Sequence, residues 1–343
     1  MKVAVIGGGA WGTALAAHAA RLPSGHEVRR WAREPEVVRD VNERHENKIF
    51  LAGVALPEAL RAFDDPKEAL EGAEIVLLVP PSAFLRRVAM DIAAFVPENA
   101  HIAIATKGIE NDSLLLMNDV AAEGLGRSKD DLAVLSGPSF AKEVASGLPT
   151  DVVIASKNTE VATALAAALH SPFFRVYTSK DPVGVEVGGA MKNVLAIAAG
   201  ACDGLGLGTN ARAALVTRGL SEMARLGVAL GGDPLTFMGL SGVGDLILTT
   251  TGALSRNRSL GLKVAEGVDA KTYLASQRAV AEGYLTAKAA YQLAQKLEVD
   301  VPITEQVHHV LHEGRPLLDA MKMLLTRAQK DELWGLASND APR

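Results

Sequence analysis

The chain has 343 residues, of which 48% are hydrophobic and 22% are charged, and its formal net charge is −5. Because a single core seldom grows past about 250 to 300 residues, this length favours two domains, and the composition is that of an ordinary globular protein. No block of basic residues occurs in the sequence. This argues against a nucleic-acid-binding protein, whose affinity depends on a concentrated positive surface.

Cysteine content and hydropathy indicate where the protein works. The single cysteine, Cys202, cannot form an internal disulfide and lies in an apolar run, so we expect a buried thiol in a reducing compartment. The N-terminal sequence MKVAVIGGG has too short an apolar segment for a signal peptide. No run approaches the roughly 18 apolar residues of a membrane span. We therefore expect a cytoplasmic protein without a membrane span.

The chain opens with a nucleotide-binding pattern. Residues 2–6 are typical of a strand buried on both faces, and residues 13–22 of an alanine-rich helix. Between them, Gly7, Gly9 and Gly12 have the spacing of the dinucleotide fingerprint, in which glycines permit a tight turn and close approach of a pyrophosphate. Because the motif has a strand before it and a helix after it, we predict a dinucleotide site rather than a merely glycine-rich turn.

The end of the second predicted strand, residues 26–31, bears on the choice of cofactor. NAD-specific sites carry Asp or Glu about 20 residues beyond the glycines, whereas NADP sites accept arginine there. Ala32 stands at the expected acidic position, Arg33 follows it, and Glu34 comes next. Arg33 would favour a 2′-phosphate, but a surface arginine that closes the strand explains the pattern nearly as well, and Glu34 has the opposite charge. The choice between NADP and NAD stays open.

Strands and helices continue to alternate in the N-terminal half. Strands are predicted at residues 74–79, 102–105, 132–135, 151–156 and 173–177, and a helix at residues 82–95. This order predicts an α/β, Rossmann-like domain with a mostly parallel sheet, whose ligands bind beyond the carboxyl ends of the strands. Polar residues follow three of these strands: Ser82 after two prolines, Lys107, and Ser139, a candidate cap of the next helix, after the turn residues Gly137 and Pro138. Each alone is more often a structural turn, but three at one sheet edge indicate a site.

The residue pattern of the C-terminal half predicts helices. Helices are predicted at residues 210–230, 286–297 and 304–313. We therefore expect a dinucleotide-binding domain at residues 1–183 and an all-α substrate and catalytic domain at residues 184–343. No metal is expected, because His308, His309 and His312 show no cysteine or carboxylate partner in register and are interpreted as surface residues.

The helical half is organised around residues 186–220. From Val194 to Cys202 no polar side chain interrupts the run, which predicts a helix buried on all sides, and Lys192 and Asn193 stand immediately before it. A lysine at the mouth of a buried helix is costly unless it is used, because burial penalises the charged form. Extension of the side chain to solvent is the simpler interpretation of Lys192 taken alone. The surrounding polar motifs favour a functional lysine.

Two polar loops lie between the later helices. The first is SGVGDL at residues 241–246, and the second is SRNR at residues 255–258, which combines a hydroxyl, an amide and two guanidinium groups suited to phosphate. A solvated loop whose arginines pair with acidic neighbours is an equally good interpretation of the second.

Seven motifs, in order, cover nearly the whole chain. They are GGGAWGTALA (7–16), ATKG (105–108), LSGPSFAKEVASGLPT (135–150), GGAMKNVLAIAAG (188–200), DGLGLGTNARAALVTRGLSEMARLG (203–227), MGLSGVGDLILT (238–249) and SRNR (255–258). Together they resemble the bacterial NAD(P)-dependent sn-glycerol-3-phosphate dehydrogenase family. Departures are small: Ala10 stands where many relatives have serine, and Pro80 is an extra proline beside the usual Pro-Ser.

The resemblance implies an oxidoreductase that transfers hydride reversibly between NAD(P)H and dihydroxyacetone phosphate, giving sn-glycerol 3-phosphate for phospholipid biosynthesis. By motif, Lys192 is the implied general acid/base. The implied substrate-binding residues are Lys107, Gly137, Ser139, Lys192, Asp245, Ser255, Arg256 and Asn257. The implied cofactor contacts are Gly7, Gly9, Ala10, Trp11, Gly12, Arg33, Lys107, Ala141, Arg256, Val280 and Glu282. The expected partner is a small phosphorylated substrate, with a homodimer left open.

The chemistry agrees with the resemblance. Oxidation of a secondary alcohol needs a base for the hydroxyl proton while the hydride leaves for nicotinamide. A lysine serves if burial and nearby cations, for which Lys107 and Arg256 are candidates, lower its pKa toward about 7 to 8. Two alternatives remain at this point: a dehydrogenase of the same architecture that acts on a hydroxy acid, and a dinucleotide-sensing protein without catalysis.

Overall fold

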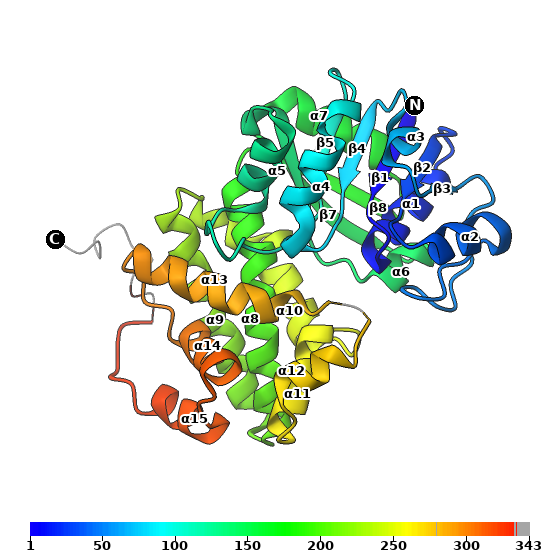
Figure 1. The fold of residues 1–343 in the computed structure, drawn as a ribbon. Helices are drawn as coiled ribbons and strands as arrows, with labels where there is room; N and C mark the ends of the chain where they lie inside the picture. The colour runs from blue at the N-terminus through cyan, green and yellow to red at the C-terminus, as the bar shows by residue number, and fades with distance from the viewer. Residues whose placement is uncertain (279, 333, 335–343) are drawn as a thin grey trace. The chain divides into compact units, whose positions relative to one another are not determined.

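The computed structural model describes residues 1–278, residues 280–332 and Trp334. They form two compact units (Figure 1). Each unit has its own apolar core. Unit 1 comprises Met1–Lys107 and Met117–Pro182, and unit 2 comprises Gly108–Leu116 and the described residues from Val183 onward. The segment Gly108–Leu116, which precedes residue 183 in the chain, belongs to unit 2 because Ile109 and Leu116 lie in the core of that unit.

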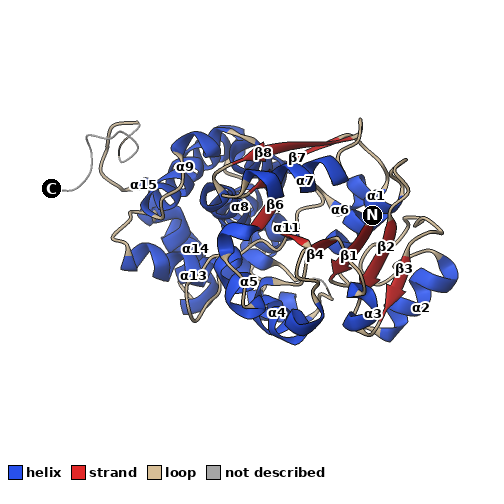
Figure 2. Cartoon of the chain, turned by 90° about the horizontal axis from the view of Figure 1, so that it is seen from above, coloured by secondary structure: helices blue, strands red, loops and turns tan. Residues whose placement is uncertain are grey.

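Unit 1 is built on an eight-stranded sheet with the order β3-β2-β1-β4-β5-β6-β7-β8 (Figure 2). The strands are β1 (Lys2–Ile6), β2 (Glu27–Trp31), β3 (Arg61–Phe63), β4 (Ile75–Leu78), β5 (His101–Ile104), β6 (Leu132–Ser136), β7 (Thr150–Ala155) and β8 (Phe174–Ser179). Neighbouring strands are parallel except β6 and β7. The predicted mostly parallel, Rossmann-like sheet is therefore confirmed. β3 was not predicted, because three residues carry no periodic signal.

The helices of unit 1 alternate with these strands. They are α1 (Ala10–Ala20), α2 (Pro35–Arg44), α3 (Pro66–Leu70), α4 (Leu85–Ile92), α5 (Met117–Leu125), α6 (Ala141–Ala145) and α7 (Thr159–Leu169). The helix predicted at residues 82–95 is α4 with a 3-10 turn at each end, Ser82–Phe84 and Ala93–Phe95. Val3 and Val5 of β1 point into one apolar cluster with residues of α1, α2 and α7. The side chains of β1 from Val3 to Ile6 are thus buried, as the uninterrupted apolar sequence of this strand predicts.

The strand order reverses at β1, which pairs with β2 on one side and with β4 on the other. In open parallel sheets a ligand binds at such a switch point, outside the carboxyl ends of the strands. Gly7 follows β1 directly at this end. The fold therefore places the glycine-rich turn where a nucleotide site is expected.

Unit 2 is helical, and no strand occurs among the described residues after Ser179. Its helices are α8 (Pro182–Gly204), α9 (Gly208–Ala229), α10 (Asp245–Thr251), α11 (Arg256–Ala265), α12 (Ala270–Ala275), α13 (Glu282–Lys296), α14 (Pro302–Glu313) and α15 (Leu317–Leu325). A 3-10 turn, Pro234–Met238, and a π turn, Leu240–Gly244, precede α10. The predicted all-helical C-terminal half is confirmed.

α8 is the central helix of unit 2. Every residue from Gly184 to Cys202 is buried except Ala198, which is half-buried. α8 is also long and apolar enough to cross a membrane, so the statement that no stretch approaches a span was wrong by that measure. Its most apolar 18-residue window is 100% buried inside the protein. Burial of the whole window marks α8 as a core helix, and Cys202 is a buried free thiol as predicted.

Glycines let other segments approach α8 at backbone distance. A Cβ on Gly188 would collide with the carbonyl oxygen of Ser241, and a Cβ on Gly200 would collide with that of Arg258. From the other side, a Cβ on Gly261 of α11 would collide with the carbonyl oxygen of Ile197. Both polar loops singled out in the sequence are thereby held directly against α8, the helix that carries Lys192.

Candidate active site

The glycine-rich turn after β1 has the geometry of a phosphate cradle. Gly7 has a φ of 146°, which side chains rarely tolerate, and a Cβ there would lie 2.7 Å from the carbonyl oxygen of Val79. Gly9 is the N-cap of α1, and the space next to its Cβ position is open. The first amides of α1 have no partner within the helix and favour an anion. The turn therefore offers both room and hydrogen-bond donors.

The carboxyl ends of β4, β5 and β6 lie side by side, as the sequence analysis expected. Thr106 Oγ1 donates to the carbonyl oxygen of Pro80 at 2.7 Å, which ties the first two ends together. Lys107 Nζ donates to the carbonyl oxygen of Gly137 at 3.3 Å, and Ser139 Oγ donates to the same oxygen at 2.9 Å. Lys107, Gly137 and Ser139 thus form one group within unit 1.

One detail of this group differs from the sequence-based expectation. Ser139 was expected to cap the next helix, but α6 begins at Ala141 with Phe140 as its N-cap. The hydroxyl of Ser139 instead bonds the carbonyl oxygen of Gly137, which has a φ of 133°. Ser139 therefore stabilises the turn.

Lys192 lies in the middle of α8, not at its mouth. The apolar run after it suggested a helix start, but the helix begins ten residues earlier, at Pro182. Lys192 is only 8% exposed, so the interpretation that its side chain extends to solvent is wrong. Its Nζ forms an ion pair with Oδ1 of Asp245, which is fully buried. The pair joins α8 to the first residue of α10.

Several interactions stabilise this buried pair. Thr249 Oγ1, one turn along α10, donates to Asp245 Oδ1 at 3.3 Å. Asp245 also stands in the first turn of α10, where the helix dipole stabilises negative charge. A carboxylate in contact with an ammonium favours the charged form of both groups. The Lys192 ammonium therefore has a defined partner in Asp245.

The SRNR loop forms the N-terminus of α11, and its residues take different roles. Ser255 is the N-cap, with its Oγ accepting from the amide of Arg258 at 3.2 Å. Asn257 is buried, donates to Asn193 Oδ1 at 2.8 Å, and accepts from the amide of Gly283 at 2.9 Å. The two asparagines thus join α8, α11 and the start of α13, a link that their types alone did not predict.

The two arginines of this loop differ in their surroundings. Arg258 Nη2 pairs with Oδ2 of Asp203 at 2.6 Å, and Arg212 binds the same carboxylate at 3.2 Å. Part of Arg256 is exposed, but burial around its guanidinium lowers its pKa, and the carboxylate of Glu282, the first residue of α13, opposes this lowering. Of the two interpretations of this loop, pairing with an acidic neighbour is therefore correct for Arg258. Arg256 remains the candidate for binding phosphate. Val280 is exposed nearby in sequence.

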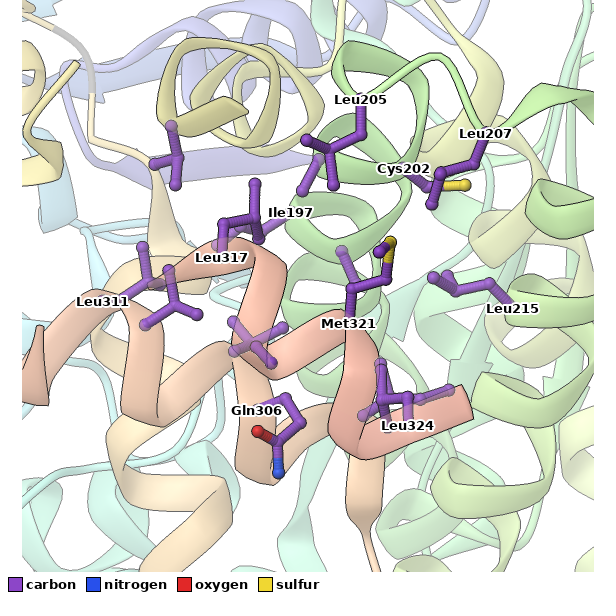
Figure 3. Close-up of a pocket in the computed structure, with 17 residues that line it drawn as sticks. Ile197, Cys202, Leu205, Leu207, Leu215, Gln306, Leu311, Leu317, Met321 and Leu324 are labelled. Atoms are coloured by element: carbon purple, nitrogen blue, oxygen red, sulfur yellow. The ribbon is translucent and has the colours of Figure 1, made fainter. Parts of the chain in front are cut away.

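A separate apolar cavity of about 80 Å³ lies in unit 2 (Figure 3). It is lined by side chains from α8, α9, α14 and α15, including Ile197, Leu215 and Met321. Gln306, the amide in this lining, already accepts from Arg315 at 2.6 Å. The lining offers no cation for a phosphate group, so this cavity is not a substrate site for a phosphorylated molecule.

The histidines of α14 were predicted wrongly. His308 and His309 are 6% and 9% exposed rather than at the surface. Carboxylates are in register with them: Glu313 accepts from His308 Nε2 at 3.2 Å and from His309 Nδ1 at 2.6 Å, and Glu305 lies 3.5 Å from His309 Nε2. The i, i+4 spacing of the glutamates was readable in the sequence. One ligand atom from each of His308, His309 and Glu313 lies within 4.8 Å of the others, and Glu313 accepts a hydrogen bond from each histidine.

A nucleotide-type sheet followed by a helical unit with a buried lysine–carboxylate pair defines a two-domain, nicotinamide-dependent dehydrogenase. Profiles of the N- and C-terminal parts of NAD-dependent glycerol-3-phosphate dehydrogenase match residues 2–162 and 181–322. The chain therefore belongs to the NAD-dependent glycerol-3-phosphate dehydrogenase family, as the motifs predicted.

Individual relatives agree with this assignment. The chain is 49% identical over 332 residues to glycerol-3-phosphate dehydrogenase [NAD(P)+] of Geobacter sp. (strain M21), covering 96% of this chain and 98% of the relative. It is also 49% identical to the enzyme so named from Nitratidesulfovibrio vulgaris (strain Hildenborough), covering 97% and 100%. The crystal structure of glycerol-3-phosphate dehydrogenase from Coxiella burnetii matches with a TM-score of 0.89 at 43% identity, covering 95% and 99%.

The residues of unit 1 fit the NAD(P) cofactor of this family. The open space at Gly9 leaves room for a diphosphate against the first turn of α1. Nε1 of Trp11 is buried and has no hydrogen-bond partner among the residues that the structure describes. A buried donor without a partner is costly unless a ligand accepts from it. The turn is therefore complete only with a bound molecule.

Proposed function

We propose that this chain reduces dihydroxyacetone phosphate to sn-glycerol 3-phosphate with NAD(P)H, and catalyses the reverse oxidation, with Lys192 as the proton-transferring residue. The observation that carries this proposal is the ion pair between Lys192 and Asp245, buried on the central helix of unit 2. Reduction of a ketone requires a proton donor at the carbonyl oxygen while the hydride arrives at carbon. The Lys192 ammonium is that donor.

Asp245 positions the ammonium and sets its charge state. In the reduction the Lys192 Nζ gives a proton to the substrate oxygen, and in the oxidation the neutral amine takes the hydroxyl proton back. Because the carboxylate stabilises the ammonium, it favours Lys192 as the acid before reduction. NAD(P)H supplies the hydride, and the residues of this chain bind, orient and protonate.

The substrate phosphate is bound at a point remote from the reacting carbon. Arg256 provides a planar guanidinium that can bind two phosphate oxygens at once. By the family motifs, the other proposed substrate-binding residues of unit 2 are Ser255, Asn257 and Asp245. Those of unit 1 are Lys107, Gly137 and Ser139. Binding energy from the phosphate orients the carbonyl and so accelerates the reaction.

The cofactor-binding roles follow the same motifs. The turn residues Gly7, Gly9, Ala10, Trp11 and Gly12 bind the diphosphate. The remaining proposed cofactor contacts are Arg33, Lys107, Ala141, Arg256, Val280 and Glu282. We place this enzyme in the cytoplasm, where its product supplies phospholipid biosynthesis, and light scattering of the purified protein decides whether it works as a homodimer.

The test is NADH and NADPH oxidation with dihydroxyacetone phosphate beside dihydroxyacetone and a 2-oxo acid. We expect kcat/KM for the phosphorylated ketone to exceed that for dihydroxyacetone by at least about 10²-fold, the worth of two charge-assisted hydrogen bonds. Faster turnover of the 2-oxo acid would make the enzyme a hydroxy-acid dehydrogenase. Cofactor binding without turnover of any of the three would make it a sensor.

A further inference from the structure

The end of α14 brings two imidazole rings and a carboxylate together. His308 and His309 are buried, with 6% and 9% of their surface exposed. Glu313, the last residue of α14, accepts from Nε2 of His308 at 3.2 Å and from Nδ1 of His309 at 2.6 Å. These two nitrogens and the carboxylate therefore face the same small region. No metal was expected from the sequence because the histidines lacked a carboxylate in register, and Glu313 removes that reason.

The spacing of these groups suits a small divalent ion. Zn²⁺ binds imidazole nitrogen and carboxylate oxygen at about 2.0 to 2.2 Å with tetrahedral angles, which separates its ligand atoms by about 3.4 Å. One ligand atom from each of His308, His309 and Glu313 lies within 4.8 Å of the others. The side chain of Glu313 is 54% exposed, so its carboxylate has room to move outward by the small distance that an inserted ion requires. The same exposure gives the ion a path of entry and admits water as a further ligand.

Contacts other than those with Glu313 hold the two rings. The ring of His308 stacks on Tyr291 of α13, with ring centroids 4.5 Å apart. The other nitrogen of His309, Nε2, lies 3.5 Å from a carboxylate oxygen of Glu305. A histidine that binds a metal through one nitrogen carries its proton on the other, and a carboxylate beside that proton fixes the ring and raises its basicity. Glu305 stands in this supporting position for His309.

The charges of the cluster favour a cation. Burial lowers the pKa of His308, while the hydrogen bond with Glu313 opposes this lowering and Lys288 adds to it. The hydrogen bond with His309 lowers the pKa of Glu313. A neutral imidazole and an ionised carboxylate are the forms that bind a metal. Lys288 would repel an ion, but the two carboxylates of Glu305 and Glu313 outweigh one ammonium, and the C-terminal end of a helix also stabilises positive charge.

We propose that Nε2 of His308, Nδ1 of His309 and the carboxylate of Glu313 bind one divalent transition-metal ion such as Zn²⁺, with water completing its coordination. Imidazole ligands select such ions over Mg²⁺ and Ca²⁺, which prefer oxygen ligands. With the ion in place, His308 carries its proton on Nδ1, which is buried and has no hydrogen-bond partner among the described residues. An unpartnered buried donor is costly, so the ion should be exchangeable and a chelator should remove it.

The experiment is a calorimetric titration of the chelator-treated full-length protein with Zn²⁺. The wild type should bind one Zn²⁺ per chain. Glu313→Gln keeps the shape of the side chain but removes the charged ligand, and it should weaken Zn²⁺ binding by more than about 100-fold. Glu305→Gln should weaken it by about tenfold to a hundredfold, as expected for a residue that supports a ligand. The matched control is His170→Gln, which removes an exposed histidine of unit 1 and should leave the affinity unchanged.

Thermal unfolding gives a second readout, because an ion that binds only the folded chain raises the midpoint of unfolding. Zn²⁺ should raise the midpoint of the wild type but not that of Glu313→Gln. It should not raise the midpoint of His309→Gln either, in which an amide can still bond Glu313 but a nitrogen ligand is lost. Mg²⁺ at the same concentration should raise none of them, because it prefers oxygen ligands.

Three outcomes would overturn the proposal. The first is a wild type that binds no Zn²⁺ or is stabilised equally by Mg²⁺. The second is a Glu313→Gln or His309→Gln protein that binds Zn²⁺ as tightly as the wild type, and the third is an equal loss of affinity in His170→Gln. None of the residues proposed for substrate or cofactor lies on α14, so these measurements do not depend on the proposed reaction.

Discussion

Two of the buried carboxylates of unit 2, Asp245 and Glu222, are stabilised in different ways. Asp245 pairs with Lys192, a side chain that can exchange a proton. Glu222, 1% exposed on α9, accepts instead from the start of α14: from the amides of Ile303 at 2.6 Å and Thr304 at 3.1 Å, and from Thr304 Oγ1 at 3.1 Å. Two of its three donors are backbone amides, and together they hold one helix against another. Burial of a charged group therefore does not by itself identify a catalytic residue.

The largest expected effect separates these two sites by activity. Lys192→Met keeps the volume of the side chain and removes the proton carrier, so the chemical step should fall by about 10²- to 10⁴-fold. Single-turnover oxidation of bound NADH measures that step directly. NADH affinity should stay near wild type, because the glycine turn is unchanged.

A double variant controls for the charge that Lys192→Met leaves unpaired. Breaking a buried pair costs about 3 to 5 kcal/mol, whereas Lys192→Met with Asp245→Asn removes both charges. We expect the double variant to recover stability but not activity.

Lys107→Ala should act on KM instead. A Lys192→Met enzyme with near-normal kcat and an unchanged pH–rate profile would transfer the acid/base role to another residue, with Lys107 next.

The second effect is on stability and should depend on pH. Burial raises the pKa of Glu222 from 4.5 to about 7. Because the folded-state pKa lies above the unfolded one, the contribution of Glu222 is most favourable below pH 4.5 and is lost as pH rises toward 7. The expected loss in the free energy of unfolding is up to about 3 kcal/mol.

Urea unfolding of the wild type and Glu222→Gln between pH 5 and 8 tests this. In Glu222→Gln, the free energy of unfolding should fall less steeply between pH 5 and 7 than in the wild type. The kcat of the variant at 25 °C should stay close to wild type. Parallel stability curves for the two proteins would mean that Glu222 does not titrate in this range, and a large loss of kcat would place it in the catalytic machinery.

The third comparison concerns the two arginines of the SRNR loop. Arg256→Ala should raise KM for dihydroxyacetone phosphate by about tenfold to a hundredfold, and Arg256→Lys should restore only part, because an ammonium lacks the planar fork. Arg258→Ala breaks the pair with Asp203 and should lower the midpoint of thermal unfolding with a smaller change in KM. Equal KM values for Arg256→Lys and wild type would exclude bidentate binding.

The smallest effect is expected at Arg33. This side chain is exposed, which limits its attraction for a 2′-phosphate to less than about 1 kcal/mol. Arg33→Ala should therefore weaken NADPH binding by no more than about fivefold at 0.15 M salt and leave NADH binding unchanged. Titration at 0.05 and 0.3 M salt checks the cause, because a screened surface charge loses its effect as salt rises. A tenfold or larger loss would show that Arg33 binds the phosphate directly.

Sequence reasoning succeeded where a local pattern requires a local structure. β1, the glycine turn and α1 were predicted because a buried strand, a tight turn and a helix N-terminus each have a short-range signal. It failed where the partner is distant. The burial of His308 and His309 depends on packing against other helices as well as on Glu305 and Glu313, and the position of Lys192 within α8 depends on where the helix begins.

The sequence by itself determined the class of fold, the family and the set of polar motifs, because these depend on periodicity, spacing and order along the chain. Only the tertiary structure decided which polar residue of each motif is left for a ligand. Arg258 is paired with Asp203 and Arg256 is not, and Lys192 meets Asp245 from 53 residues away. Each of these outcomes depends on burial and on contacts between residues that are close in space. Separation along the chain determines neither burial nor such contacts.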